Sequence, residues 1–217
     1  MIIEDRFTTY IDSLNWQIPE YLKKVESQAL ADEVPIIRRS MQSLLSFVLR
    51  ERRPKRILEI GTAVGFSGLL LREYAGENAK IDTIEKVPQR IEAAKANFAR
   101  YDTTGQIHLI EGDATEVLEQ LAEENKRYDF IFMDAAKGQY LHFLKPILNM
   151  LSTEGMLVTD NVLQDGDIIE SRYAITKRDR TIHKRMREYL YTLTHDDALN
   201  TVILPVGDGV TLTTRLD

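Results

Sequence analysis

The stretch Leu58-Glu59-Ile60-Gly61-Thr62-Ala63-Val64-Gly65-Phe66-Ser67 runs from a short apolar segment into a loop with two glycines. The segment Arg56–Ile60 has the length and apolar character of a buried strand. Gly61 and Gly65 let the backbone turn sharply and approach a ligand closely. Because ligands of open parallel sheets bind beyond the carboxyl ends of the strands, the stretch predicts a ligand-binding loop after a first parallel strand.

Apolar segments and helical patterns then alternate along the chain, which is typical of parallel βαβ units with right-handed crossovers. The near-continuous apolar run at 130–133 favours strands that are buried on both faces. The expected strands are Arg56–Ile60, Lys80–Ile84, Gln106–Ile110, Tyr128–Met133 and Gly155–Thr159, and the expected helices between them are Ser67–Tyr74, Pro88–Tyr101, Ala114–Asn125 and Tyr140–Leu151.

The two ends of the chain differ from this alternation. Pro19–Glu33 is amphipathic, and Pro35 opens a second apolar pattern with helical spacing, so the N-terminal region is predicted to be helical. Near the other end we expect a basic helix over about Asp179–Leu193. Strands at Thr201–Pro205 and Gly209–Thr214 follow, and the Asp-Gly pair at 208–209 predicts an antiparallel hairpin.

Together these elements predict a seven-stranded, mostly parallel sheet with a C-terminal antiparallel hairpin and helices on both faces. We expect a single domain over 1–217, with an N-terminal helical region at 1–52 and an α/β core at 53–217.

The composition fits a globular protein of 217 residues, 43% of them apolar and 29% charged. The sequence has no cysteine, which excludes disulfides and thiolate metal sites. No apolar run is long enough for a membrane span, and the residues at 1–6 do not read as a signal peptide, so we expect a cytoplasmic protein. The net charge of -6 argues against non-specific coating of nucleic acid, although a local basic patch remains compatible with it.

Three acids stand at or next to the ends of successive predicted strands: Glu59, Glu85 and Asp113. The glycine spacing is not that of a dehydrogenase loop, and an acid such as Glu59 repels pyrophosphate but suits an ammonium group. Glu85 can accept both hydroxyls of a ribose, and Asp113 can accept from the amine of adenine. Alternatively, Glu85 is an acid favoured near a helix N-terminus, and Asp113 is a helix cap. In register, the three favour a cationic nucleoside such as S-adenosylmethionine.

A second set of polar residues follows the fourth and fifth predicted strands. Asp134, Asp160 and Asn161 offer only hard oxygen ligands, which suit Mg²⁺ or another divalent cation, whereas Asp160-Asn161 alone would indicate a turn. Lys137, three residues after Asp134, can face the same pocket and act as a general base. The alternative for Lys137 is an ordinary surface lysine.

These motifs together resemble the cation-dependent, catechol-type O-methyltransferases of the class I, Rossmann-like fold. The resemblance covers roughly Val34 to the C-terminus. It rests on the loop at 58–67, Thr83-Ile84-Glu85, Glu111-Gly112-Asp113-Ala114, Met133-Asp134-Ala135-Ala136-Lys137, Thr159-Asp160-Asn161-Val162-Leu163 and Gly207-Asp208-Gly209.

The resemblance implies three sets of site residues. The cation would be bound by Asp134, Asp160 and Asn161. Lys137 would be catalytic, together with Asp134. The S-adenosylmethionine site would be lined by Ile37, Glu59, Gly61, Ser67, Glu85, Asp113, Ala114 and Asp134. The resemblance also implies a homodimer, in which Phe7, Tyr10, Trp16 and Tyr21 are candidates to cover the partner or the acceptor mouth.

Within that family the chain is similar to bacterial tRNA 5-hydroxyuridine methyltransferases. The likeness lies in Asp134-Ala135-Ala136-Lys137-Gly138-Gln139-Tyr140, in the run Asp160-Asn161-Val162-Leu163 and in the basic stretch before Lys184. Asp179, His183 and Gln164 depart from the family patterns. The acceptor must present two adjacent oxygens, and both a catechol and 5-hydroxyuridine do so.

The basic stretch favours a tRNA anticodon loop whose wobble base enters the pocket and becomes 5-methoxyuridine. Its candidate contacts are Arg178, Arg180, Lys184 and Arg185. A small catechol-like or caffeoyl-type acceptor is the alternative. A nucleotide-dependent oxidoreductase and a non-catalytic RNA-binding module are further alternatives. The basic stretch itself has an ordinary alternative, which is a charged protein surface that contacts only solvent.

Overall fold

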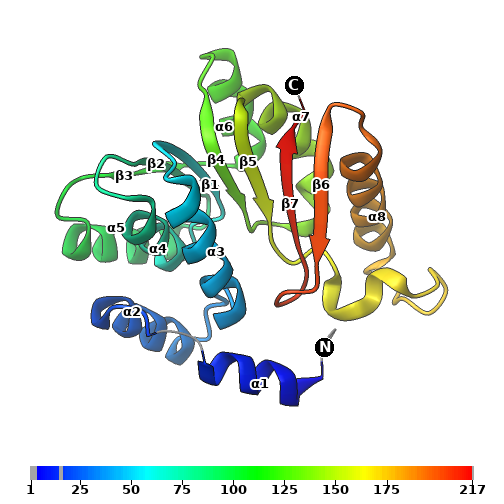
Figure 1. Ribbon diagram of the computed structural model, residues 1–217, viewed down its shortest axis with the longest axis horizontal. Helices are drawn as coiled ribbons and strands as arrows, with labels where there is room; N and C mark the ends of the chain where they lie inside the picture. The colour runs from blue at the N-terminus through cyan, green and yellow to red at the C-terminus, as the bar shows by residue number, and fades with distance from the viewer. Residues whose placement is uncertain (1–3, 15–16, 217) are drawn as a thin grey trace.

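The computed structural model describes residues 4–14 and 17–216, and within them it contains one seven-stranded sheet (Figure 1). The strand order is β3-β2-β1-β4-β5-β7-β6. The first five strands are parallel, and β7 pairs antiparallel with both β5 and β6. The strands are β1 (Arg56–Ile60), β2 (Lys80–Glu85), β3 (Ile107–Glu111), β4 (Tyr128–Met133), β5 (Leu151–Thr159), β6 (Leu199–Leu204) and β7 (Val210–Arg215).

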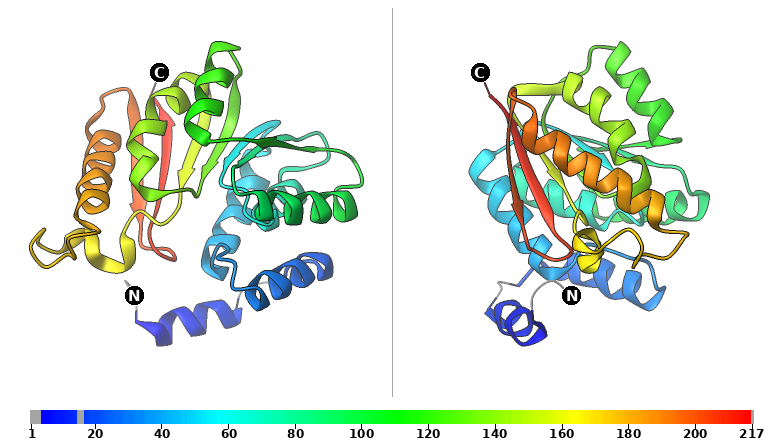
Figure 2. Two further views of the ribbon diagram at one scale, coloured as in Figure 1. Left: turned by 180° about the vertical axis from the view of Figure 1, so that it is seen from behind. Right: turned by 90° about the vertical axis from the view of Figure 1, so that its right-hand side faces the viewer.

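Helices cover both faces of this sheet (Figures 1 and 2). One layer holds α2 (Glu20–Ala31), α3 (Arg39–Arg52), α4 (Phe66–Ala75) and α5 (Pro88–Tyr101), with α1 (Asp5–Leu14) beside α3. The opposite layer holds α6 (Ala114–Glu123), α7 (Tyr140–Met150) and α8 (Arg180–His195). Two 3₁₀ segments, η1 (Lys137–Gln139) and η2 (Gln164–Ile169), follow β4 and β5.

The side-chain alternation of the central strands explains why they are apolar throughout. In β1, Ile57 packs into the layer of α3 and α4, whereas Leu58 and Ile60 pack into the layer of α6 and α7. Phe130 and Ile131 of β4 divide between the two layers in the same way. Because both faces are covered by helices, neither set of side chains meets solvent, as the sequence pattern predicted.

The predicted architecture is confirmed, with corrections at element boundaries. The helix expected from Pro35 begins only at Arg39, because Arg38 is extended (φ -66°, ψ 156°). Ile37 lies before the helix, and its apolar side chain is buried. The strand expected from Gly155 begins at Leu151, directly after α7. Tyr128 pairs with Leu151 across a register shift, so polar residues at 152–154 belong to a strand that their composition did not indicate.

The register brings the ends of the central strands together at one edge of the sheet. Ile60 lies opposite both Ile84 and Met133, and Met133 lies opposite Thr159. The turn between β6 and β7 reaches the same edge (Figure 1). The loops that leave β1, β2, β4 and β5 therefore surround one region. No helix among the described residues is long and apolar enough to span a membrane.

Candidate active site

A cavity of about 530 Å³ lies at this edge of the sheet. Its floor is formed by the loops after β1, β2, β3, β4 and β5. The extended segment before α3 and the β6–β7 turn close its sides. The predicted site residues that line it are Ile37, Gly61, Ser67, Glu85, Asp113, Ala114, Asp134, Asp160 and Asn161. Glu59 and Lys137 are not among the lining residues.

The glycine loop is shaped by a close backbone approach. Gly61 has φ +105°, and a Cβ added there would lie 2.0 Å from the backbone oxygen of Asp134. Gly65 is also left-handed (φ +85°), and its Cβ would meet the Phe98 ring at 2.6 Å. The two glycines thus set the spacing between the β1 loop, the β4 loop and α5, which the sequence predicted only in part because Phe98 had not been assigned to the site.

Glu59 lies beneath this loop and is fully buried. Its Oε2 accepts a hydrogen bond from Thr83 Oγ1 at 2.5 Å, while Oε1 has no hydrogen-bond partner. Burial raises the pKa of Glu59 to about 7. Hydrogen bonds from the hydroxyl groups of Ser67 and Thr83 partly offset this effect, because they lower the same pKa. Thr83 was quoted only as part of the motif that ends in Glu85 and was not predicted as a site residue, because a threonine inside a strand carries no signal of its own for a site.

Glu85 and Asp113 both line the cavity, and the carboxylate of each also accepts hydrogen bonds from backbone N–H groups. Glu85 Oε2 accepts from the backbone N–H of Ala63, and Oε1 accepts from those of Lys86 and Val87, each at 2.9 Å. Asp113 is the cap of α6, which was the structural alternative for this residue. It also accepts from Lys86 Nζ at 3.0 Å.

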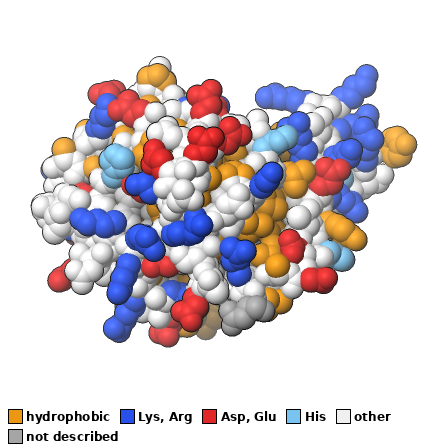
Figure 3. Space-filling model, turned by 90° about the horizontal axis from the view of Figure 1, so that it is seen from above, with side chains coloured by type: hydrophobic (Ala, Val, Ile, Leu, Met, Phe, Trp, Pro, Cys, Tyr) orange, Lys and Arg blue, Asp and Glu red, His pale blue; other side chains and the backbone are white. Residues whose placement is uncertain are grey.

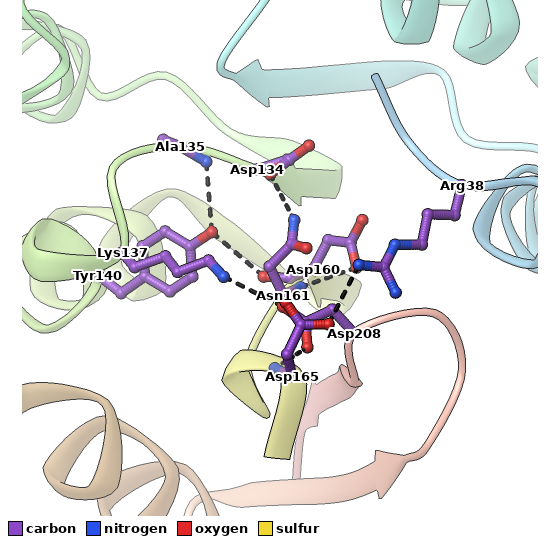
Figure 4. Close-up of polar contacts among 9 residues, drawn as sticks. All are labelled: Arg38, Asp134, Ala135, Lys137, Tyr140, Asp160, Asn161, Asp165 and Asp208. Carbon is purple, nitrogen blue, oxygen red and sulfur yellow. Dashed lines mark hydrogen bonds and ion pairs between the residues drawn. The ribbon is translucent and has the colours of Figure 1, made fainter. Parts of the chain in front are cut away.

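The second acidic cluster lies across the cavity, after β4 and β5 (Figure 4). Asn161 Nδ2 donates to Asp134 Oδ1 at 2.9 Å, and the Asn161 backbone N–H donates to Asp160 Oδ1 at 2.7 Å. Burial raises the pKa of Asp134. Burial and then the negative charge of Asp134 raise the pKa of Asp160 to about 7.

This donor set is compatible with a hard divalent cation. Within the described residues no three His, Cys, Asp or Glu side chains form a metal cluster, so the set consists of two carboxylates and one amide. Those are oxygen donors of the kind that Mg²⁺ and Ca²⁺ prefer. The raised pKa of Asp160 reflects negative charge gathered in a buried place, which a cation would relieve.

Lys137 and Asp208 form an ion pair at the edge of this cluster (Figure 4). The Lys137 ammonium donates to Asp208 Oδ2 at 3.1 Å. Asp208 Oδ1 accepts from the backbone N–H of Asp165, whose carboxylate pairs with Arg38 at 3.2 Å. Asp208 was predicted as part of a hairpin turn and of a family motif, but not as a site residue. The available signal was the hairpin itself: because β7 pairs antiparallel with β5, the turn from β6 into β7 lies at the edge where β5 ends.

The four predicted tRNA contacts do not all lie in the helix. Arg178 precedes α8 and is exposed, whereas the other three belong to α8. Arg180 donates to the Ile175 carbonyl at 3.2 Å, and Arg185 donates to the Gly138 carbonyl at 2.9 Å. Lys184 is exposed, and its Nζ lies 3.5 Å from Glu188 Oε1. Figure 3 shows Lys and Arg side chains gathered at the end of the molecule that α8 and the preceding segment form.

The aromatic residues expected to meet a partner differ in their surroundings. Phe7 and Tyr10 of α1 are exposed, at 50% and 63%. Tyr21 instead donates to Glu73 Oε2 at 2.5 Å and stacks near Tyr101, so it is engaged within its own fold. Trp16 lies outside the described residues.

The sequence profile of the O-methyltransferase family matches residues 13–216. A caffeoyl-CoA O-methyltransferase of Citrus natsudaidai is 28% identical over 204 residues, which cover 91% of this chain and 88% of that protein. O-methyltransferase ankF of Aspergillus thermomutatus is 30% identical, covering 76% of this chain and 73% of its own.

Solved structures agree with the sequence relatives. A putative caffeoyl-CoA O-methyltransferase from Staphylococcus aureus superposes with a TM-score of 0.88 at 30% identity, covering 98% of this chain and 100% of that one. The methyltransferase PaMTH1 of Podospora anserina, solved with S-adenosylhomocysteine bound, gives a TM-score of 0.87 at 30% identity, with coverage of 98% and 95%. The chain therefore belongs to the O-methyltransferase family of S-adenosylmethionine-dependent enzymes.

Proposed function

We propose that this methyltransferase is cation-dependent and that its acceptor is 5-hydroxyuridine at the wobble position of tRNA, which it converts to 5-methoxyuridine. The observation that carries the proposal is the bond from Arg185 to the Gly138 carbonyl. It joins the basic helix α8 to η1, the segment that begins with Lys137, so α8 packs against the part of the chain that carries the proposed catalytic lysine.

S-adenosylmethionine fits the cavity on the β1, β2 and β3 side. Glu85 and Asp113 would meet the ribose and the adenine, and Ile37 would pack on the cofactor. Glu59, beneath the loop, would act on the cofactor through Ser67 and the loop backbone. The product S-adenosylhomocysteine is present in the structure of the relative from Podospora anserina, which supports this donor.

Asp134, Asp160 and Asn161 would hold the cation. When bound, the cation would lower the pKa of the acceptor hydroxyl and fix its orientation. The acceptor oxygen then attacks the methyl carbon in line with the sulfonium, the new O–C bond forms, and the old C–S bond leaves its electron pair on sulfur. Lys137 would take up the hydroxyl proton, and the buried walls would exclude competing water.

The surface next to the cavity supports a nucleic-acid acceptor. The segment between η2 and α8 projects from the body at the same end as the strand tips (Figure 1). Its Arg172, Lys177 and Arg178 are exposed. Its Tyr173 is 87% exposed. Exposed cations can hold phosphates, and an exposed aromatic ring can stack on an unpaired base. An anticodon loop offers both partners.

A small catechol-type acceptor is the second candidate, and the comparisons favour it over tRNA. Several relatives carry the name caffeoyl-CoA O-methyltransferase, and the names of the relatives compared above do not mention tRNA. A caffeoyl group presents two adjacent hydroxyls, which would suit the same oxygen donors. The homodimer implied by the family resemblance remains part of the proposal, with the exposed α1 residues Phe7 and Tyr10 as its candidates.

One assay separates the two acceptors. The protein is given S-adenosylmethionine, Mg²⁺ and either 5-hydroxyuridine-containing tRNA or caffeoyl-CoA, and the methylated products are identified by mass spectrometry. We expect 5-methoxyuridine from the tRNA. Methylation of caffeoyl-CoA with none of the tRNA would overturn the tRNA acceptor and leave the cation-dependent chemistry in place. An Arg178→Gln variant, altered away from the cavity, should lose tRNA methylation at low tRNA concentration only.

A further inference from the structure

Asp208 is a buried carboxylate that joins two segments of the site wall. Its side chain is 2% exposed. One oxygen accepts from Lys137 Nζ at 3.1 Å, and the other accepts from the backbone N–H of Asp165. The Asp208 carbonyl also accepts from the Leu163 N–H at 2.9 Å. The segment that carries Lys137 and the loop after β5 thus meet at one side chain.

The Lys137 ammonium has other anions within electrostatic reach. Its positive charge acts on both Asp134 and Asp160, yet its hydrogen bond goes to Asp208. A lysine side chain has a flexible four-carbon stem, so a fixed anion decides where its nitrogen rests. An ammonium resting on Asp134 or Asp160 would compete with a cation for the same carboxylates. Figure 4 shows Lys137 directed toward Asp208.

We infer that Asp208 is a positioning residue for methyl transfer: it holds the Lys137 nitrogen at the rim of the cavity, off the two carboxylates proposed for the cation. The inference rests on the proposed role of Lys137 in proton transfer. Asp208 lines the cavity, but both of its carboxylate oxygens are engaged by Lys137 and by the backbone N–H of Asp165. In this proposal Asp208 affects the reaction only by fixing the position of the Lys137 nitrogen.

Asp208→Asn separates this role from the structural one. The asparagine carbonyl can still accept from the Asp165 N–H, so the loop keeps its bond. The amide NH₂ then faces the Lys137 ammonium, donor against donor, and the ion pair is lost. Asp165→Asn is the matched control, since it removes a neighbouring carboxylate and the pair with Arg38 but keeps the backbone N–H.

The first test is a cycle of four proteins: wild type, Asp208→Asn, Lys137→Met and the double variant. We expect Asp208→Asn to lower kcat by about 10- to 100-fold with the Kd for S-adenosylmethionine within about twofold of wild type, because a misplaced group chiefly slows the reaction step. In the Lys137→Met background the same change should alter kcat by less than about twofold. Losses that multiply in the double variant would overturn the inference.

The second test needs no acceptor. Each protein is treated briefly with acetic anhydride, and acetylation of Lys137 is measured by mass spectrometry against the exposed Lys145 of the same molecule. We expect Lys137 to react several-fold more slowly than Lys145 in wild type and in Asp165→Asn, and faster in Asp208→Asn. Equal reactivity of the two lysines in wild type would overturn the inference, even if Asp208→Asn failed to fold. If no acceptor is methylated while this protection is seen, the proposed function fails and the contact stands.

Discussion

Glu59→Gln should stabilise the protein at high pH much more than at low pH. Burial raises the pKa of Glu59 from 4.5 to about 7. The folded state therefore binds the proton more tightly than the unfolded state, so the charged carboxylate costs stability as the pH rises from about 4.5 to 7. Well above pH 7 the cost is about 3 kcal/mol, since one pKa unit is about 1.4 kcal/mol. Glutamine carries no charge and avoids this cost.

The quantity to measure is the change, between two pH values, in how much more stable Glu59→Gln is than wild type. The glutamine amide has to find a partner where Glu59 Oε1 has none, and that contribution does not vary with pH. The stability gain of the variant over wild type should therefore be larger at pH 8 than at pH 5 by about 2.5 kcal/mol.

The assay is urea unfolding of both proteins at pH 5, 6, 7 and 8, with the exposed Glu92→Gln as the control. A gain that is the same at pH 5 and pH 8 would refute the reasoning. At pH 8 the variant should also bind S-adenosylmethionine more weakly, measured by calorimetry, if Glu59 supports the cofactor loop.

Three further predictions follow from the site. Gly61→Ala should cost on the order of 3 kcal/mol of stability, measured by urea unfolding, because its Cβ would overlap the Asp134 backbone and φ is positive; a loss below about 1 kcal/mol would contradict the close approach. Asp160→Ala, or a chelator, should abolish turnover and leave S-adenosylmethionine binding within about twofold by calorimetry; full turnover in a chelator would refute the cation. Neutralising four cations should flatten the salt dependence of tRNA binding, and an unchanged slope would exclude them as phosphate contacts; the four are Arg178, Arg180, Lys184 and Arg185.

The fold and the cavity wall were predictable because they depend on local patterns. Strand-length apolar segments separated by helical ones specify a parallel sheet, and the sheet brings Glu85, Asp113, Asp134 and Asp160 to one edge. The Asp-Gly pair at 208–209 gave the hairpin for the same reason, since a tight turn needs those residue types in sequence.

What the sequence did not reveal depends on contacts between distant segments. The pairs Lys137–Asp208 and Arg38–Asp165 join residues 71 and 127 positions apart. Ile37 was read as helical because its spacing to Met41 and Leu44 is helical, yet it precedes the helix and is buried from a segment without regular secondary structure. The length of the basic helix was overestimated at its start by one residue, and the exposed cations before it lie in a projecting segment.

The most direct test of the account is the nucleoside composition of tRNA from cells that lack this protein. Total tRNA is digested to nucleosides and analysed by mass spectrometry, with cells that carry the intact gene and cells complemented by Asp160→Ala as controls. We expect 5-methoxyuridine to disappear and 5-hydroxyuridine to accumulate, both in the deletion and with Asp160→Ala. Unchanged 5-methoxyuridine in the deletion would contradict the tRNA acceptor.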